Sequence, residues 1–468
     1  MSSEDAGGVG SLPRVDLSGQ KRVHVVGVGG AGMSAVASVL ASMGHRVTGS
    51  DLKASPAFDR LSTSGVRVQV GHDGALMGDA EVLSISTAIP ADNPEVVLAR
   101  QRGIPVATRA ETLAAICASR RLVAVSGTHG KTTTTTLLSL ILVEAGRHPS
   151  FLIGGDVNEI GTNAVWDKGE WLVAEADESD GTFLVLDPEV AVVTNIEPDH
   201  LDFYGGFDEL VDAFDRFCAS ASQKVVASAD DVVAKELGIR HGATLVGVSE
   251  NAEFRIVSVH TNRDGVSFDL QHRGDNLGRL SLPVGGANLA SNAGVAAATA
   301  ITMGVEFEAA QRAFARFAGV ARRFEHRGDA RGVRFMDDYA HLPTEVSAVL
   351  AAARATSPER LVAIFQPHRY SRTASVWSQF RDSFGAADLV VITDVYPAGE
   401  DPVPGVTGKL IADVVGEAHP ELDVHYLPDR ESLPKQVAGL LRPGDLCLTM
   451  GAGDLTSLAD ELLVAPEW

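Results

Sequence analysis

Short apolar runs that lead through a glycine loop into a helix-like run are the feature that most constrains this fold. VHVVGV at residues 23–28 is followed by AGMSAVASVLASMG at residues 31–44, which predicts a buried strand and a helix closed by glycine. RVTGSD then predicts the next strand, and RLVAVSG at residues 121–127 starts the same pattern again. Strands that alternate with helices predict parallel sheets with helices on both faces.

The length of 468 residues suggests about three α/β domains, at roughly 100–200 residues each. We expect a disordered N-terminal extension over residues 1–20 and a Rossmann-like domain over residues 21–118. A central P-loop-type ATPase domain with a mainly parallel sheet is expected over residues 119–322, and a Rossmann-like α/β domain over residues 323–468. Alternating pieces between residues 251 and 283, such as FRIVSVH and VSFDLQH, predict an antiparallel addition.

Composition disfavours several classes of function. The chain is 45% hydrophobic and 21% charged, and its net charge of −22 disfavours nucleic-acid and anionic-membrane partners. Cys117, Cys218 and Cys447 are too widely spaced for a disulfide framework or a zinc motif, and suggest buried thiols in a reducing compartment. No apolar run approaches the roughly 18 residues of a membrane span, and the acidic start MSSEDAGG is unlike a signal peptide. We therefore expect a cytoplasmic protein.

The segment SGTHGKTTTTT at residues 126–136 is the strongest local signal. Its glycines lie between a strand and a helix, where backbone N–H groups can surround phosphate oxygens at a positively polarised helix start. Lys131 can place a charge on the β- and γ-phosphates, and the Thr132 hydroxyl can bind Mg²⁺. Val125 stands where the full P-loop pattern has glycine, so this loop is shorter. The alternative is a glycine turn with a solvated lysine, but consecutive threonines form helices poorly, which favours a functional reason.

Acidic and histidine-bearing loops follow two further apolar strands. AEADESD contains Glu175, Asp177, Glu178 and Asp180, and it is either a solvated acidic loop or the source of an ATPase metal carboxylate. In TNIEPDHLDFY, His200 is a second metal ligand, a base or a surface imidazole. Its place at the carboxyl end of a predicted parallel strand favours a functional role.

The first domain carries a second glycine loop. Gly27, Gly29 and Gly32 form a G-x-G-x-x-G pattern between a strand and a helix, and Asp51 ends the next strand 24 residues after Gly27. This pattern is typical of NAD binding. Its physical content is a backbone cradle for a pyrophosphate with an acid near a ribose, so any nucleoside diphosphate would fit.

The last domain contains two polar clusters after predicted strands. FMDDYAHLPTE carries Asp337, Asp338, Tyr339 and His341, which we expect just beyond a strand. IFQPHRYSRT carries His368, Arg369 and Arg372, and on a helix the two arginines would share one face. Arginines can be ordinary surface charge, but beside histidine in so acidic a chain they indicate an anion receptor.

Together these motifs resemble the Mur ligase family, in register from about residue 22 to residue 453. GVGGAGMS, GTHGKTTTT, AEADESD, TNIEPDHLD, ARRFEHRG, DDYAHLPTEV, FQPHRYSRT and VYPAGEDP are most similar to the L-alanine-adding member. The resemblance implies an ATP-dependent ligase of peptidoglycan precursor synthesis that joins L-alanine to the carboxylate of UDP-N-acetylmuramate through an acyl phosphate. ATP would be a substrate, and Mg²⁺ or Mn²⁺ the metal. The three domains would bind the UDP substrate, bind ATP, and close over the active site, in that order.

The same resemblance implies roles for particular residues. ATP would contact Gly127, Thr128, His129, Gly130, Lys131, Thr132, Thr133, Asn288, Asn292, Arg323 and Asp338. The UDP substrate would contact Gly29, Gly30, Ala31, Gly32, Met33, Ser50, Asp51, Ser86, Thr87, Tyr339 and His368. The metal ligands would be Thr132, Glu175 and His200. The catalytic residues would be Lys131, His200, His341, Arg369 and Arg372. Either His200 or His341 would be the base that takes the proton from the amine.

Two positions depart from the family pattern, because Ala287 and Leu342 stand where histidines are usual. Three other functions stay open. The first is a ligase that attaches a whole tripeptide to the same sugar acid, and the second is an NAD-dependent oxidoreductase built on the first glycine loop. The third is a catalytically silent nucleotide-binding protein, which is disfavoured by the presence of Lys131, Thr132, Glu175 and His200. The sequence does not decide between a monomer and a homodimer.

Overall fold

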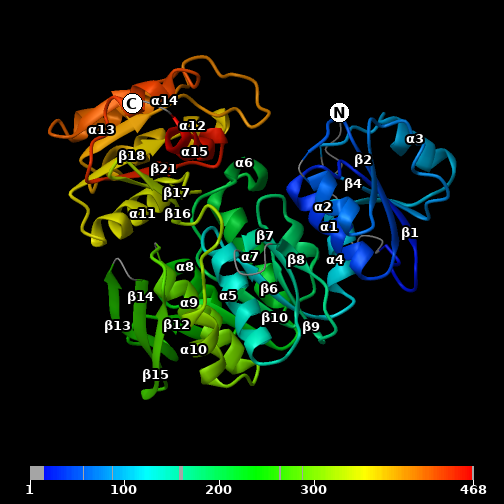
Figure 1. Cartoon of the computed structure of the whole chain (residues 1–468). Helices are drawn as coiled ribbons and strands as arrows, with labels where there is room; N and C mark the ends of the chain where they lie inside the picture. The colour runs from blue at the N-terminus through cyan, green and yellow to red at the C-terminus, as the bar shows by residue number, and fades with distance from the viewer. Residues whose placement is uncertain are drawn as a thin grey trace, which may run out of the picture. The chain divides into compact units, whose positions relative to one another are not determined.

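The structure is a computed structural model that describes residues 15–55, 57–86, 88–157, 162–262, 265–286 and 288–465 (Figure 1). The chain divides into two compact units. The first comprises Met1–Asp156, Ile160–Phe254 and Val295–Ala310, and the second comprises Val157–Glu159, Arg255–Gly294 and Gln311–Trp468.

The N-terminal part of the first unit is built on a five-stranded parallel sheet with the order β3-β2-β1-β4-β5. Its strands are β1 Arg22–Val26, β2 Arg46–Asp51, β3 Arg67–Val70, β4 Val82–Ile85 and β5 Val106–Thr108. Its helices are α1 Ala31–Ser42, α2 Ala57–Thr63, α3 Pro94–Gln101 and α4 Arg109–Cys117. The strand order reverses at β1, and ligands of open parallel sheets bind beyond the carboxyl ends of the strands at such a point.

Local sequence explains where these helices begin and end. The Asn93 side chain caps α3 by accepting hydrogen bonds from the backbone N–H groups of Glu95 and Val96. A capping box between Thr108 and Glu111 starts α4. After α1, Gly44 adopts a φ of 94°, which confirms the predicted glycine closure of that helix.

The central part of the first unit contains a second, mainly parallel sheet, in which β6 lies between β9 and β10. This sheet has ten strands, of which seven lie in this part: β6 Arg121–Ser126, β7 Ser150–Val157, β8 Thr162–Val165, β9 Trp171–Glu175, β10 Val190–Val193, β11 Lys224–Ser228 and β12 Thr244–Gly247. The helices are α5 Lys131–Glu144, α6 Leu201–Tyr204, α7 Phe207–Ser220 and α8 Val232–Arg240. Because β6, β9 and β10 are parallel neighbours, the loops at their carboxyl ends lie at one edge of the sheet.

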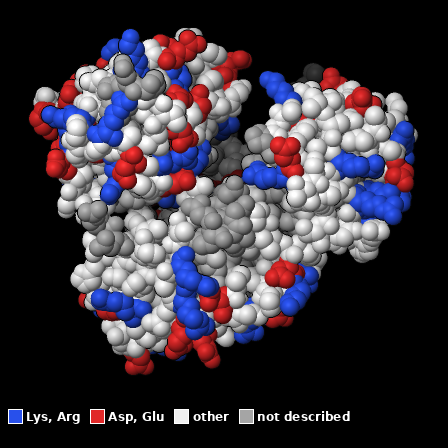
Figure 2. Space-filling model, viewed as in Figure 1, with Lys and Arg blue, Asp and Glu red and all other residues white. Residues whose placement is uncertain are grey.

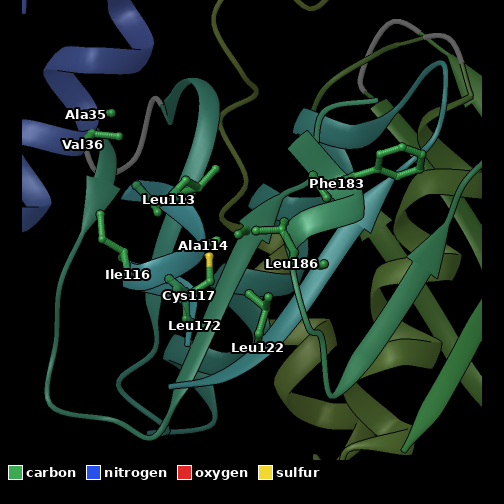
Figure 3. Close-up of a cluster of buried hydrophobic side chains, with 14 of the residues drawn as sticks. Ala35, Val36, Leu113, Ala114, Ile116, Cys117, Leu122, Leu172, Phe183 and Leu186 are labelled. Carbon is green, nitrogen blue, oxygen red and sulfur yellow. The ribbon is translucent and has the colours of Figure 1, made fainter. Parts of the chain in front are cut away.

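The first unit has a continuous apolar core that joins its two sheets. Leu113 and Cys117 of α4 belong to the same buried cluster as Leu122 of β6 and Leu172 of β9 (Figure 3). Phe183, in the short 3₁₀ segment Thr182–Val185 after β9, is buried in this cluster too. The helix that closes the first sheet therefore packs directly against the strands of the second.

The other three strands of the ten-stranded sheet are β13 Phe254–Asn262, β14 Gly265–His272 and β15 Asp275–Leu282, which belong to the second unit from Arg255 onwards. β14 and β15 pair antiparallel, with a register shift between Leu270 and Gln271. This pairing confirms the predicted antiparallel addition. The helices α9 Leu289–Thr302 and α10 Phe307–Ala315 follow, and the division between the two units falls within each of them.

The C-terminal part of the second unit is a six-stranded sheet with the order β16-β17-β21-β18-β19-β20. Its strands are β16 Glu325–Ala330, β17 Val333–Asp338, β18 Arg360–Phe365, β19 Leu389–Ile392, β20 Asp423–Tyr426 and β21 Asp445–Met450. Its helices are α11 Pro343–Ala355, α12 Tyr370–Val376, α13 Lys409–Ala418, α14 Leu433–Ala438 and α15 Ser457–Val464. Among the described strands of this sheet, the β16–β17 pairing is antiparallel and the other pairings are parallel.

The predicted α/β class, with mainly parallel sheets, is confirmed. The predicted domain limits stay predictions, and residues 1–14 of the predicted extension lie outside the described residues. One local prediction was wrong: Asp337 and Asp338 do not follow a strand but are the last two residues of β17, and both are buried. Two consecutive acidic residues break the apolar pattern of this strand, so the sequence predicted that the strand ends before them.

The surface and the cysteines fit the expectations from composition. On the face shown in Figure 2, basic and acidic side chains are interspersed, so this face offers no continuous basic patch. Cys117, Cys218 and Cys447 are free and buried, and burial raises the pKa of the first two thiols to about 12. Over the described parts of the chain, no helix is long and apolar enough to cross a bilayer.

Candidate active site

The phosphate loop predicted at residues 127–132 joins β6 to α5. Gly127 has a φ of 137°, and a Cβ there would lie 2.1 Å from Thr194 Oγ1, so only glycine fits. Gly130 has a φ of 79° and is the residue from which α5 begins. The two glycines thus let the chain turn sharply into the positively polarised start of a helix.

The loop after β10 holds the phosphate loop in place. The His129 backbone N–H donates to Asn195 Oδ1 at 2.8 Å, and Asn195 Nδ2 donates to the His129 carbonyl oxygen at 2.9 Å. Thr194 Oγ1 donates to the same carbonyl at 2.6 Å. Sequence reasoning quoted the TNIEPDH segment but assigned no role to Thr194 or Asn195, because a hydrogen bond between distant loops leaves no local pattern.

Lys131, at the start of α5, is held by an ion pair. Its Nζ lies 2.8 Å from Glu178 Oε1 and 2.7 Å from the Gly127 carbonyl oxygen, and the Lys131 and Glu178 side chains are 14% and 3% exposed. Burial disfavours the charged ammonium, but the carboxylates of Glu178, Asp177 and Glu175 outweigh it and raise the pKa of Lys131. Burial raises the pKa of Glu178, and Lys131 opposes that shift.

Thr132 and Glu175, two of the predicted metal ligands, lie together. Thr132 Oγ1 donates to Glu175 Oε2 at 3.0 Å, and the Gly154 backbone N–H donates to the same oxygen at 2.8 Å. A hydroxyl and a carboxylate beside a phosphate loop suit Mg²⁺, which takes oxygen ligands and keeps several waters. The residues present therefore fit the implied metal, although among the described residues no three His, Cys, Asp or Glu side chains form a metal cluster by themselves.

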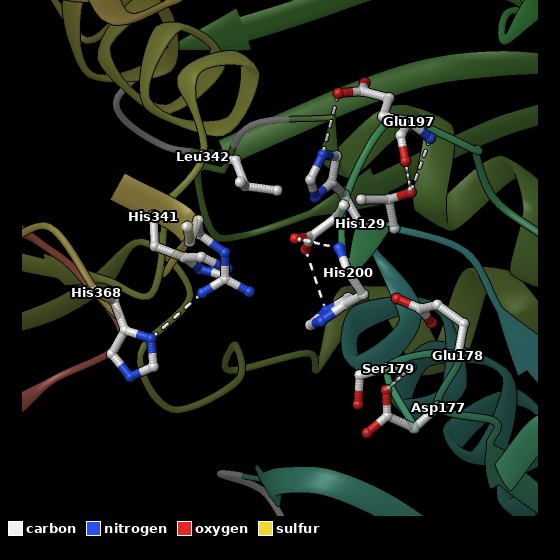
Figure 4. A network of polar contacts seen from close by, with 12 residues as sticks. His129, Asp177, Glu178, Ser179, Glu197, His200, His341, Leu342 and His368 are labelled. Carbon is white, nitrogen blue, oxygen red and sulfur yellow. Dashed lines mark hydrogen bonds and ion pairs between the residues drawn. The ribbon is translucent and has the colours of Figure 1, made fainter. Parts of the chain in front are cut away.

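His200, the third predicted metal ligand, follows β10 with a φ of 53°. Its Nε2 lies 3.2 Å from Asp199 Oδ2, and its backbone N–H donates to Asp199 Oδ1 at 2.8 Å (Figure 4). Nearby, His129 Nε2 lies 3.3 Å from Glu197 Oε2. The metal and base roles of His200 stay predictions.

The remaining threonines of the loop continue into α5, where Thr133 is half-buried and Thr134, Thr135 and Thr136 are fully buried. The hydroxyl of Thr135 donates to the Lys131 carbonyl oxygen, and that of Thr136 to the Thr132 carbonyl oxygen, each at 2.8 Å. These two hydroxyls are therefore satisfied within the helix, whereas the buried hydroxyl of Thr134 has no hydrogen-bond partner among the described residues. Only Thr132 directs its hydroxyl to a carboxylate, which separates it from the other threonines of the run.

The second glycine loop lies at the carboxyl ends of β1, β2 and β4. The Gly29 backbone N–H donates to Asp51 Oδ2 at 2.8 Å, and Ser86 donates its N–H to the Val26 carbonyl oxygen at 3.2 Å. Gly30 precedes α1, Gly32 and Met33 lie in its first turn, and Met33 is buried. The structure thus brings together most of the predicted UDP contacts. Thr87 and the side chain of Ala31 lie outside the described residues.

Ser50, another predicted UDP contact, belongs to a buried polar network that sequence reasoning missed. Its hydroxyl donates to Glu95 Oε2 at 2.5 Å, and Glu95 also lies 3.3 Å from His24 Nε2 and 3.2 Å from His72 Nδ1. Glu95 is fully buried; burial opposes its ionisation, but hydrogen bonds from His24 and Ser50 lower its pKa. The network ties β1, β2 and the segment after β3 to α3.

In the second unit, Arg323 and Asp338 lie where the chain enters the C-terminal sheet. Asp338 Oδ2 accepts the Phe324 backbone N–H at 2.7 Å, and Oδ1 accepts that of Ala340 at 2.8 Å. Burial, opposed by Arg323, raises the pKa of Asp338 to about 6. The guanidinium of Arg323 lies over the Tyr339 ring at 5.1 Å. Asn292, at the start of α9, donates its N–H to the Asn288 carbonyl oxygen at 2.9 Å, and Ala287 lies outside the described residues.

The histidine and arginine cluster of the second unit is only partly as predicted. His368 stacks on Tyr396 with ring centroids 5.6 Å apart, and its Nδ1 lies 3.3 Å from Arg372 NH1 (Figure 4). His341 lies 6.2 Å from His368 between ring centroids, and its Nδ1 lies 3.3 Å from Glu345. Burial, with His341 and Arg372, lowers the pKa of His368 to about 4. This histidine is therefore neutral near pH 7.

The expectation that Arg369 and Arg372 share one helix face was wrong. Arg369 lies before α12 with a φ of 68°, and its Nε is 3.1 Å from Glu400 Oε1. Glu400 also accepts the Ser371 backbone N–H at 3.0 Å. The two guanidinium groups consequently have different partners. Tyr396 and Glu400 belong to VYPAGEDP, which was recognised as a motif but given no role.

Comparison with known proteins identifies the family. The chain matches three family models: "Mur ligase family, catalytic domain" at residues 22–121, "Mur ligase middle domain" at residues 125–300, and "Mur ligase, glutamate ligase domain" at residues 322–453.

Full-length relatives agree with these matches. The chain is 47% identical to a UDP-N-acetylmuramate–L-alanine ligase of Rubrobacter xylanophilus, over 94% of this chain and 99% of that protein. It is 44% identical to one of Geobacter, over 95% and 97% of the two chains. The structure of a UDP-N-acetylmuramate-alanine ligase of Thermotoga maritima is similar with a TM-score of 0.80, 27% identity, and coverage of 95% and 98%. A phosphate loop, its adjoining carboxylate and these matches lead to one conclusion: the chain belongs to the Mur ligase family.

Proposed function

We propose that this chain ligates L-alanine to the carboxylate of UDP-N-acetylmuramate, with conversion of ATP to ADP and phosphate, in peptidoglycan precursor synthesis. The observation that carries the proposal is the similarity along 94% of the chain to a ligase of that name, at 47% identity. The buried Lys131 beside a glycine loop, and the adjoining Thr132 and Glu175, support an ATP site in this chain.

The proposed reaction begins when the sugar-acid carboxylate attacks the γ-phosphate of ATP. Two anions must meet, so positive charge is needed at the transferred phosphate. Lys131 would supply one charge, and backbone N–H groups at the start of α5 would add partial charges. Thr132 and Glu175 would hold Mg²⁺, which would neutralise part of the triphosphate charge. The products of this step are ADP and an acyl phosphate.

In the second step the neutral amine of L-alanine attacks the acyl carbon, the bond to the phosphate oxygen breaks, and inorganic phosphate leaves. The amine must lose a proton, and His200 and His341 are the candidate acceptors. The acyl phosphate is sensitive to water, so the residues around it must exclude solvent. Arg369, Arg372 and His368 would bind the anionic groups of the reactants, with the neutral state of His368 leaving the positive charge on the arginines.

Two alternatives are weaker. A ligase that attaches a tripeptide to the same sugar acid has the same fold, and a murein peptide ligase of Psychrobacter arcticus is similar at a TM-score of 0.68. Its identity of 23%, however, supports the fold alone. An NAD-dependent oxidoreductase would leave the phosphate loop and Glu175 without a purpose. Competition between L-alanine and the tripeptide in one ligation assay would separate the two ligases.

The test of the proposal is release of inorganic phosphate from ATP by the purified full chain with Mg²⁺ and UDP-N-acetylmuramate. We expect sustained release only when L-alanine is added, together with an L-alanine-containing UDP product seen by mass spectrometry. Release that is indifferent to both the sugar nucleotide and L-alanine would contradict the proposal.

A further inference from the structure

The ion pair between Lys131 and Glu178 joins two motifs to which no common role has been assigned. Lys131 belongs to the phosphate loop, and Glu178 follows β9 three residues after the predicted metal carboxylate Glu175. Their charged atoms are 2.8 Å apart, and only 3% of the Glu178 side chain is exposed. An ion pair so buried is strongly coupled, because removal of one partner leaves an uncompensated charge in a poorly solvated place.

Glu178 has little freedom to move away. Its carbonyl oxygen accepts a hydrogen bond from the Tyr204 hydroxyl of α6, which anchors its main chain. Its Oε1 faces Lys131, whereas its Oε2 is buried and has no hydrogen-bond partner among the described residues. A buried carboxylate oxygen without a donor is costly, so this side chain depends on Lys131 for its compensation.

Nucleotide phosphates and Glu178 require the same ammonium group. A lysine in a glycine loop at a helix start is placed to neutralise β- and γ-phosphates. If Lys131 turns to those phosphates, Glu178 is left as a second buried anion close to the first. Two unit charges a few ångströms apart repel each other by about 3 kcal/mol even at an effective dielectric constant of about 20.

We propose that Glu178 competes with nucleotide phosphate for Lys131, so that the loop binds metal-free nucleotide poorly and binds it well only together with a divalent cation. The proposal rests on the proposed ATP site. Glu178 would then be compensated by the positive charge of the cation held at Thr132 and Glu175, whose side chains already adjoin. Such coupling would make nucleotide without its metal an ineffective ligand and would prevent unproductive complexes.

The test is isothermal titration of the full-length wild type and of Glu178→Gln with ATP, once in EDTA and once with Mg²⁺. Gln keeps the shape and removes the charge. In EDTA we expect Glu178→Gln to bind ATP about tenfold more tightly than the wild type, or tighter still. The gain in affinity on adding Mg²⁺ should be correspondingly smaller in the variant. Metal-free ATP that binds Glu178→Gln no more tightly than the wild type would overturn the proposal.

Glu189→Gln is the matched control, because Glu189 forms a 2.6 Å ion pair with Arg121 at the opposite end of β6. It should leave both affinities at wild-type values. If Glu178→Gln does not fold, Glu178→Ala removes the same charge and should likewise tighten binding of metal-free ATP. Failure of the proposed function looks different: neither the wild type nor Glu178→Gln would bind ATP with Mg²⁺, and that result would overturn both proposals.

Discussion

At the scale of single residues, burial determines which charges of this chain have chemical consequences. Lys131 is largely buried in the phosphate loop, and His368 is held close to Arg372 in the second unit. The pKa of Lys131 is raised by neighbouring carboxylates, whereas burial and nearby cations lower that of His368. Each side chain is thus kept in the protonation state that its proposed role requires at neutral pH.

Lys131→Ala should lower the rate of ligation by at least about 100-fold, because each ~1.4 kcal/mol of lost transition-state stabilisation reduces the rate tenfold. The measurement is phosphate release at saturating substrates. Lys168→Ala, which removes an exposed lysine of the same unit, should leave the rate unchanged. Near-normal turnover of Lys131→Ala would show that this loop is not the ATP site.

His368 should make the fold sensitive to acid. Its pKa in the folded chain is about 4, below the ordinary 6.5, so the unfolded chain binds a proton first as the pH falls. The stability contributed by neutral His368 is therefore present above about pH 6.5 and is lost as the pH falls towards 4.

The corresponding measurement is the melting temperature of wild type and His368→Gln at about pH 7 and about pH 5. The fall in melting temperature should be smaller in the variant. His148→Gln, at a histidine whose side chain is 50% exposed, should behave as the wild type. An equal fall in all three proteins would argue against this titration.

Individual residues could be predicted where the residue type itself carries the chemistry. Lys131, Thr132 and Glu175 each stand in a local pattern that a phosphate or metal site requires. The contacts that hold this loop could not be predicted, because Asn195 reaches His129 and Glu178 reaches Lys131 across gaps in sequence that only the folded sheet closes. Glu95 is the clearest case, since nothing local distinguishes this fully buried carboxylate from those of the partly exposed Glu81 and Glu111.

At the scale of elements, α5 shows how a poor helix former becomes useful. Four of the five threonines in residues 132–136 are buried, and the hydroxyls of Thr135 and Thr136 are satisfied by carbonyl oxygens one turn earlier. The strand–helix rhythm predicted this helix and its parallel neighbours because it depends on local periodicity. The end of β17 and the start of α12 were misjudged, because buried aspartates and a positive φ at Arg369 are imposed by tertiary contacts.

Thr132→Val and Thr136→Val should affect different properties, ATP binding and stability respectively, although each removes one hydroxyl from α5. Thr132 donates to Glu175, so its loss should weaken Mg²⁺-dependent ATP binding by about tenfold or more. Thr136 donates only to a helix carbonyl, so its loss should cost about 1 kcal/mol of stability at most and leave ATP binding unchanged. Titration calorimetry and thermal melting of the pair would check this, and equal ATP affinities would remove Thr132 from the metal site.

At the scale of the whole molecule, the residues that we propose for the different reactants belong to different units. The glycine loop and Asp51, which we propose for the UDP group, belong to the first unit. Arg369 and Arg372 belong to the second. Binding of the sugar nucleotide and reaction of its carboxylate should therefore be separable by substitution.

Arg372→Lys tests this separation. Arg372 can present a planar fork to a carboxylate or phosphate, and lysine keeps the charge but loses the fork. The shorter lysine also loses the contact with His368, whose Nδ1 is 3.3 Å from Arg372 NH1. We expect turnover to fall about tenfold and the L-alanine requirement to rise, as for loss of one charge-assisted interaction. Binding of UDP-N-acetylmuramate alone should keep its wild-type affinity, because the glycine loop and Asp51, which we propose for the UDP group, belong to the first unit.

The comparison needs two further variants. Arg381→Lys removes a fork from an exposed arginine of the same unit and should be silent. Arg369→Lys should also reduce turnover, but it loosens the contact with Glu400 and the start of α12, so its melting temperature should fall as well. If Arg372→Lys and Arg369→Lys both show wild-type kinetics, these arginines are solvated surface charges. The anion receptor of the reaction must then be sought elsewhere in the second unit.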